Sequence, residues 1–219
     1  MDNDPPAPQP PVFDETFQDQ LTDLFRWRRD VRQFLTTPLA AGQLDSLLTL
    51  AALAPSVGHS QPWRFVKVVS PDRRQAIRNN FLSCNADALA DYHGEKARLY
   101  ATLKLHGMDQ APEQLAVFVD GTTETGRGLG QKTMPETLQY SVVSAINMLW
   151  LAARARGIGV GWVSIIDPQE VGKILDVPTH WSLIAYLCIG YPEHHHIDPE
   201  LHRLGWQERL DIGAFISER

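Results

Sequence analysis

The sequence has little cysteine, no excess of positive charge and no long run without polar residues. Cys84 and Cys188 form no CxxC pair, so the sequence predicts neither a disulfide framework nor a thiolate metal site. Two buried thiols in a reducing cytoplasm are the expected state. The formal net charge of -6 gives no basic surface for nucleic acid or anionic lipid. The longest uncharged window, 137–153, contains Gln139 and Asn147, which indicates a buried helix and not a membrane span.

The periodicity of apolar residues predicts one globular domain. Residues 1–12 are rich in proline and are expected to be a disordered tail, and residues 13–219 are expected to form a single domain. The expected helices are 17–25, 44–54, 72–93, 95–104, 136–156 and 168–175. The expected strands are 63–69, 115–119, 160–166 and 183–189. This order predicts a mixed α/β (α+β) sandwich, followed by an arm whose apolar anchors pack on another subunit or on the chain's own surface.

Arginine is concentrated directly after the first expected helix, in the run Arg28-Arg29-Asp30-Val31-Arg32. Guanidinium groups bind phosphate through paired hydrogen bonds, which makes this run a candidate phosphate site. A solvated, charged helix end would have the same composition. The run alone therefore leaves both interpretations open.

The loop 54–63 joins a helix to a strand and carries hydroxyl groups, an amide and two prolines. Ser56 and Gln61 are candidates for binding a heterocycle, although a tight connection that leads Trp63 into the core explains the same residues. The glycines of 157–161 run from helix to strand, the reverse of a phosphate cradle, so we reject a dinucleotide site there. Glycine at a strand start still lets a flat ring approach the backbone.

Histidine is also clustered, in His194-His195-His196. Consecutive side chains point in different directions, and no acidic or sulfur partner has ligand spacing nearby. We therefore expect a polar loop there and no metal site.

Taken together, five segments resemble the 5,6-dimethylbenzimidazole synthase family, within the FMN-dependent nitroreductase superfamily. These segments are 28–32, 54–63, 104–107, 150–154 and 159–164. The first is similar to the superfamily motif Arg-Arg-Ser-x-Arg, except that Asp30 replaces the serine. The synthases are known by an aspartate at this position and by a serine in a Gly-Trp-Val-Ser segment, which Asp30 and Ser164 match.

The resemblance implies a nitroreductase-like fold, with a mixed central sheet flanked by helices and a C-terminal arm. It further implies a homodimer that binds flavin mononucleotide (FMN) at its interface. Reduced FMN would be the substrate and would react with molecular oxygen to give dimethylbenzimidazole, the lower ligand of cobalamin, and erythrose 4-phosphate. A separate flavin reductase would supply the reduced FMN.

The resemblance also implies roles for individual residues. Asp30 is the candidate catalytic base and Ser164 would orient the reacting ring. The segment 104–107 would lie over the flavin, although His106 stands where relatives carry glutamate. The expected FMN-binding residues are Arg28, Arg29, Asp30, Arg32, Ser56, Gln61, Lys104, Gly161, Ser164 and Arg209. Two alternatives remain: a nitroreductase that uses NADH or NADPH, and a flavin-binding protein without catalytic activity.

Overall fold

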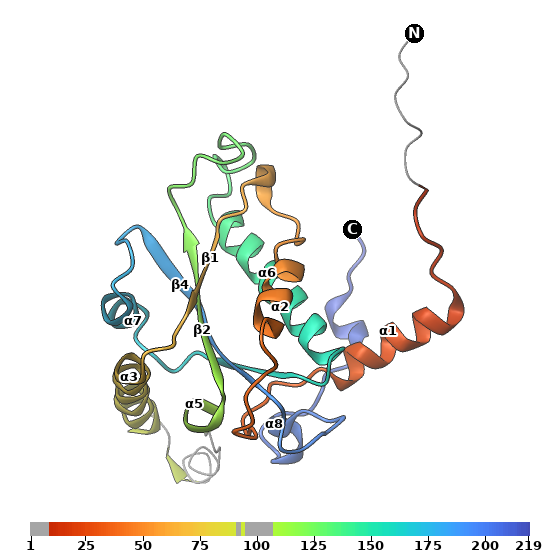
Figure 1. Cartoon of the computed structure of the whole chain (residues 1–219). Coiled ribbons are helices and arrows are strands. Elements are labelled where there is room, and N and C mark those ends of the chain that lie inside the picture. Colours follow the sequence, from red (N-terminus) through yellow and green to blue (C-terminus); the bar gives the residue numbers. More distant parts are fainter. Residues whose placement is uncertain (1–8, 91–92, 95–106) are drawn as a thin grey trace.

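A central β-sheet organises the chain (Figure 1). The computed structural model describes residues 9–90, 93–94 and 107–219. Within these residues the strands β1 (Trp63–Lys67), β2 (Glu113–Asp120), β4 (Trp181–Gly190) and β3 (Gly159–Val163) lie in that order, each antiparallel to its neighbour. A parallel bridge between Asp30 and Val160 extends the sheet beyond β3, which makes it mixed, as expected.

Helices cover both faces of this sheet (Figure 1). The helices α2 (Gln43–Ala51) and α6 (Thr137–Arg154) pack on one face, and α3 (Pro71–Ala90) and α7 (Pro168–Leu175) pack on the other. Side chains alternate between the two faces of a strand. In β4, Leu187 therefore packs with the α6 layer, while its neighbours Tyr186 and Cys188 pack with the α3 layer.

Most predicted elements within the described residues exist, but two strands end earlier than predicted. β3 ends at Val163 and not at 166, because Asp167 already caps α7: its Oδ1 accepts hydrogen bonds from Gln169 N at 2.8 Å and Glu170 N at 3.1 Å. β1 ends at Lys67, since α3 begins at Pro71. The predicted helix 95–104 and residues 1–8 of the predicted tail lie outside the described residues.

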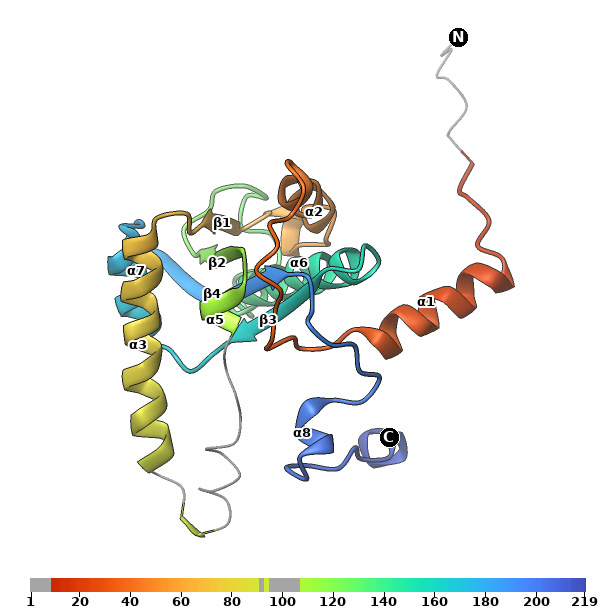
Figure 2. The same cartoon turned by 60° about the horizontal axis from the view of Figure 1, so that its bottom comes forward.

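The two ends of the chain contribute little to the core. The helix α1 (Glu15–Trp27) leads away from the sheet, and the C-terminal segment, with α8 (Glu200–Arg203) and η2 (Ile212–Phe215), lies beside it (Figures 1 and 2). α1 has no buried residue, and Phe215 is 66% exposed. Exposed apolar surface of this kind is typical of an interface. That the arm packs on another subunit stays a prediction.

None of the helices in the described ranges is long and apolar enough to cross a membrane.

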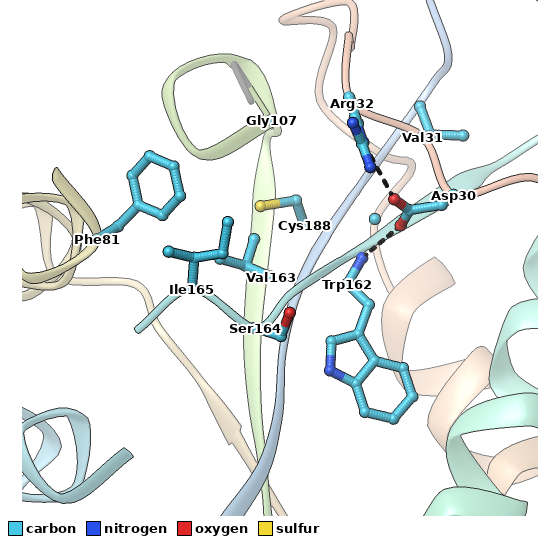
Figure 3. Close-up of a pocket in the computed structure, with 11 residues that line it drawn as sticks. Asp30, Val31, Arg32, Phe81, Gly107, Trp162, Val163, Ser164, Ile165 and Cys188 are labelled. Atoms are coloured by element: carbon cyan, nitrogen blue, oxygen red, sulfur yellow. Dashed lines mark hydrogen bonds and ion pairs between the residues drawn. The ribbon is translucent and has the colours of Figure 1, made fainter. Parts of the chain in front are cut away.

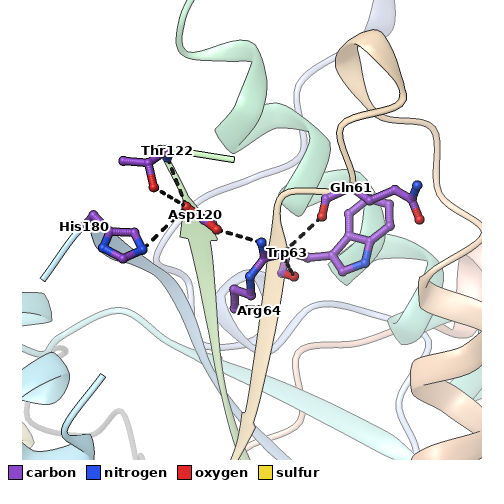
Figure 4. Close-up of polar contacts among 6 residues, drawn as sticks. All are labelled: Gln61, Trp63, Arg64, Asp120, Thr122 and His180. Carbon is purple, nitrogen blue, oxygen red and sulfur yellow. Dashed lines mark hydrogen bonds and ion pairs between the residues drawn. The ribbon is translucent and has the colours of Figure 1, made fainter. Parts of the chain in front are cut away.

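A polar cluster ties β1 to β2 at one end of the sheet (Figure 4). Asp120 Oδ2 accepts a hydrogen bond from Arg64 Nη2 at 2.6 Å, and Asp120 Oδ1 accepts from the Thr122 amide and hydroxyl, both at 3.0 Å. Burial raises the pKa of Asp120, but the hydrogen bonds from Thr122 and the charge of Arg64 outweigh it and hold the pKa below the ordinary value. The charged carboxylate therefore stabilises the fold.

We predict that Asp120→Asn lowers the free energy of unfolding by about 1.5 to 3 kcal/mol near neutral pH, because it weakens hydrogen bonds to a charged group. A lowered pKa contributes stability that is present above the unfolded-state value of 3.8 and is lost as the pH falls through the folded-state value. Urea unfolding of both proteins across the acid range should therefore show the difference shrinking below that value. A difference independent of pH would contradict this account.

Candidate functional site

A pocket opens where the segment after α1 meets β3 (Figure 3). Residues 30–32 form one wall and residues 161–165 the other. Phe81 of α3, Gly107 of α5 (Gly107–Gln110) and Cys188 of β4 complete the lining. Asp30, Arg32, Gly161 and Ser164, which are distant in sequence, thus share one pocket. That they bind FMN stays a prediction.

The backbone of β3 holds Asp30 in place. Val31 N donates to Val160 O at 3.0 Å, and the Trp162 amide donates to Asp30 Oδ1 at 2.8 Å (Figure 3). Gly161 permits this approach, because a Cβ there would lie 2.1 Å from Val31 O. The glycine therefore has a packing role, whether or not a ring also stacks there.

A chain of ion pairs leads from the pocket to the C-terminal segment. Arg32 Nε lies 3.3 Å from Asp30 Oδ2, and Arg32 Nη1 lies 3.4 Å from Glu200 Oε2 of α8. Only 17% of the Arg32 side chain is exposed. Asp30 therefore has both oxygens engaged, one by a backbone amide and one by a guanidinium group that Glu200 also holds.

The far wall of the pocket is apolar. Phe81, Val163 and Ile165 line it, with the Cys188 thiol at its base. Burial, and then the charge of Asp30, raise the pKa of Cys188 to about 12. The thiol therefore stays protonated at neutral pH and is not a nucleophile. Asp30, Arg32 and Ser164 supply the polar side chains of this pocket.

A second hollow gathers several arginines. Arg28, Arg29 and Arg209 line it together with Arg26, and Asp198 and Glu208 in the same lining balance part of their charge. Burial lowers the pKa of Arg29, and the charges of Arg28 and Arg209 lower it further. Within the described residues, Arg29 Nε is buried without a hydrogen-bond partner. A bound phosphate would satisfy this donor and offset the mutual repulsion of the arginines, so the cluster fits the phosphate of a mononucleotide.

Ser56 and Gln61, the two predicted binding residues of the loop 54–63, lie away from the Asp30 pocket. Ser56 Oγ accepts a hydrogen bond from Gln61 N at 3.1 Å, and the next residue, Pro62, is tied to Asp120. Asp120, near the loop, pairs with Trp181, the first residue of β4. Val160, which bridges to Asp30, pairs with Ile189, eight residues further along the same strand. At about 3.3 Å per residue the two places are roughly 26 Å apart. Within one chain, a single mononucleotide cannot contact both.

Two other predicted features need separate mention. Lys104 and His106 lie outside the described residues, so only Gly107 of the predicted lid is seen, at the pocket wall. In the ranges that the structure describes, no group of three or more His, Cys, Asp or Glu side chains could hold a metal ion. In the histidine run, His195 Nδ1 instead lies 3.2 Å from Arg154 Nη1.

The sequence interpretation missed Phe81, Ile165, Cys188 and Glu200. Alternation along β4 could have placed Cys188 on the pocket side, since Tyr186 and Cys188 share a face. No sequence pattern near Glu200 points to a role in the pocket, because its partner Arg32 lies far away in the sequence.

Comparisons with known proteins identify the family. The family model described as "Nitroreductase family" matches residues 25–191. A 5,6-dimethylbenzimidazole synthase from Rhodospirillum rubrum is 58% identical over 199 residues, which cover 91% of this chain and 94% of that protein. One from Rhodobacter capsulatus is 49% identical, with 90% and 96% covered. Iodotyrosine deiodinase bound to FMN and 3-iodo-L-tyrosine has a similar structure, with a TM-score of 0.68, 26% identity and 80% and 91% covered.

We predict that Gly161→Ala disturbs the pocket more than it disturbs the rest of the fold. The new Cβ must push Val31 away, and overpacking of this kind typically costs about 1–3 kcal/mol. Hydrogen exchange should show faster exchange of the Trp162 amide, which Asp30 protects in the wild type. Gly172→Ala is the control, since a Cβ there lies at an ordinary 3.7 Å from Val177. Unchanged exchange at Trp162 in Gly161→Ala would contradict the packing role.

Proposed function

This chain belongs to the nitroreductase family and, within it, to the 5,6-dimethylbenzimidazole synthases, and from that premise we propose that its Asp30 pocket fragments reduced FMN. The observation that carries the proposal is the meeting of Asp30 and Ser164 in one pocket beside an arginine cluster with an unpaired buried nitrogen. Reduced FMN is the substrate, and it supplies the electrons for reaction with molecular oxygen. The products are dimethylbenzimidazole, erythrose 4-phosphate and the remaining pyrimidine part of the flavin ring.

The residues of the chain divide the work of binding. Arg28, Arg29 and Arg209 hold the phosphate, because they line one hollow and the charges of Arg28 and Arg209 lower the pKa of Arg29. Arg32 lies between that hollow and Asp30, in a groove that Arg29 also lines. The apolar wall around Phe81 keeps water from the reacting ring, which suits a reaction with oxygen.

Asp30 is the proposed base, and Ser164 orients the ring. Benzimidazole formation takes one carbon from the ribityl chain, so a proton acceptor is needed near that chain. The Trp162 amide and Arg32 hold the Asp30 carboxylate in a fixed orientation, which matters more for proton transfer than a high basicity. Ser164 lines the same pocket and carries a hydroxyl group that can donate to a ring heteroatom or accept from one.

A homodimer is part of the proposal. Ser56 and Gln61 lie far from the Asp30 pocket of their own chain, so they can bind FMN only in the pocket of a second copy. The exposed apolar residues of α1 and of the C-terminal segment give that second copy a surface to cover. Lys104 would add a lid contact. The reduced FMN comes from a separate flavin reductase.

We predict that Arg209→Ala weakens FMN binding by roughly 10- to 100-fold, which corresponds to about 1.5–3 kcal/mol for a hydrogen bond to a charged group. Titration by flavin fluorescence measures this loss, and added salt should reduce the difference from the wild type. Arg219→Ala, which removes another exposed arginine, is the control and should bind as the wild type does. Equal affinities of all three proteins would remove Arg209 from the phosphate site.

We predict that Asp30→Asn still binds FMN but forms no dimethylbenzimidazole. The amide keeps the size and the acceptor oxygen for Trp162 N but cannot take up a proton. Chemically reduced FMN is mixed with each protein in air, and the product is measured by mass. Asp176→Asn is the matched control, because Asp176 lies in the left-handed region at φ 56°, which asparagine tolerates. Wild-type yield from Asp30→Asn would show that Asp30 is not the base.

A further inference from the structure

Two loops interlock through glycines at the end of the sheet opposite the Asp30 pocket (Figures 1 and 2). One is the turn 56–61, which contains η1 (Val57–His59), and the other is the loop 124–131 between β2 and α6. A Cβ on Gly126 would lie 2.2 Å from Gly58 O, and a Cβ on Gly58 would lie 2.6 Å from Leu129 O. Neither glycine can carry a side chain unless a backbone moves, so the loops behave as one unit.

The same two loops concentrate backbone strain. His59, Gln61 and Arg127 have φ values of 55°, 46° and 53°, in the left-handed region that side chains rarely adopt. Elsewhere in the described residues, only Asp176 among the non-glycine residues does so. Strain of this kind persists only where the surroundings determine the conformation, and it is concentrated at functional sites.

Hydrogen bonds from the sheet and from α6 also hold the backbone of the turn that contains Gln61. Arg64 Nη1 donates to Gln61 O at 3.3 Å, and Arg64 is itself fixed by Asp120 (Figure 4). Ser141 of α6 accepts a hydrogen bond from Val57 N at 3.0 Å through its Oγ. The Gln61 side chain nevertheless stays exposed, with its amide nitrogen 3.3 Å from His59 Nε2. The structure therefore fixes the backbone of a residue whose side chain faces outward.

We propose that the loop 124–131 is a positioning element that holds Ser56 and Gln61 against the FMN of a second copy of this chain. This inference rests on the proposed function, since the FMN is the one bound beside Asp30 of the other copy. A second copy is the occupant because the chain's own pocket is roughly 26 Å away along β4. Leu129, at the surface of the loop, is 72% exposed and would also be covered.

The first test compares two glycines of the same loop. Gly126 and Gly128 have φ values of 80° and 71°, so alanine is strained at both, but a Cβ on Gly128 meets nothing within 4 Å. Gly126→Ala should weaken FMN binding and lower kcat/KM by up to about 100-fold, as displacement of a binding group by 1 Å can. Gly128→Ala should remain close to the wild type. Equal effects of the two changes would overturn the proposal.

The second test mixes two defective chains. Gly126→Ala and Asp30→Asn chains carry different tags, are produced together, and the mixed dimers are purified. If the loop acts on the other copy, one site of each mixed dimer has an intact Asp30 and an intact loop, and product formation returns to about half of the wild-type value per dimer. If the loop acts within its own chain, both sites are defective. No recovery in mixed dimers, with an active wild type, would overturn the proposal.

A second variant covers the case in which Gly126→Ala does not fold. A Cβ on Gly130 would lie 2.9 Å from Val57 Cγ2. Gly130 has a φ of 79°, so alanine is strained there as it is at Gly128, but only at Gly130 does it also meet Val57. Gly130→Ala should therefore weaken FMN binding more than Gly128→Ala does, and Val57→Ala in the same chain should remove that additional loss. FMN affinity can be measured without turnover. A wild type that binds FMN but forms no benzimidazole would refute the proposed function. The affinities of the variants would still test the role of the loop. Equal affinities of Gly130→Ala and Gly128→Ala, or no gain from Val57→Ala, would overturn that role.

Discussion

The arrangement of the pocket depends on one hydrogen bond, from the Trp162 amide to the Asp30 carboxylate at 2.8 Å. It forms only because Gly161 lets the segment after α1 lie against β3, where a Cβ would meet Val31 O. The bond holds residues 30–32 against the edge of the sheet, where they line the pocket, and it fixes the carboxylate that the proposed reaction needs. Arg32 and Glu200 then complete the surroundings of that carboxylate and connect it to the C-terminal segment.

Electrostatics support the proposal that the hollow lined by Arg29 binds the phosphate of the substrate. The chain is acidic overall, with a formal net charge of -6, yet Arg28, Arg29 and Arg209 are gathered in one hollow. Bringing like charges together and burying one of them is unfavourable, and the lowered pKa of Arg29 reflects both causes even with Asp198 nearby. In the proposed complex a phosphate would offset this cost, and its binding energy would hold the ring and the ribityl chain beside Asp30.

The sequence predicted the elements better than their contacts. Runs of β-branched, aromatic and other apolar residues identified the strands, and the resemblance pointed to Asp30 and Ser164 because both lie in local motifs. The Arg32–Glu200 pair was not predictable, since Glu200 lies in an irregular segment without a pattern that points to its partner. The contact of Gly58 with Gly126 is equally non-local, because a glycine in a loop does not show which backbone it lets approach. The early end of β3 came from the Asp167 cap, which competes with strand pairing for the same residues.

The central claim is that this chain consumes its flavin and does not recycle it. The most direct measurement supplies the protein with chemically reduced FMN that carries carbon-13 in the ribityl chain, exposes it to air and analyses the products by mass. The account predicts loss of FMN, dimethylbenzimidazole with one heavy carbon, and erythrose 4-phosphate in equal amount. Quantitative return of oxidised FMN without benzimidazole, together with fast oxidation of NADPH by the protein alone, would contradict it.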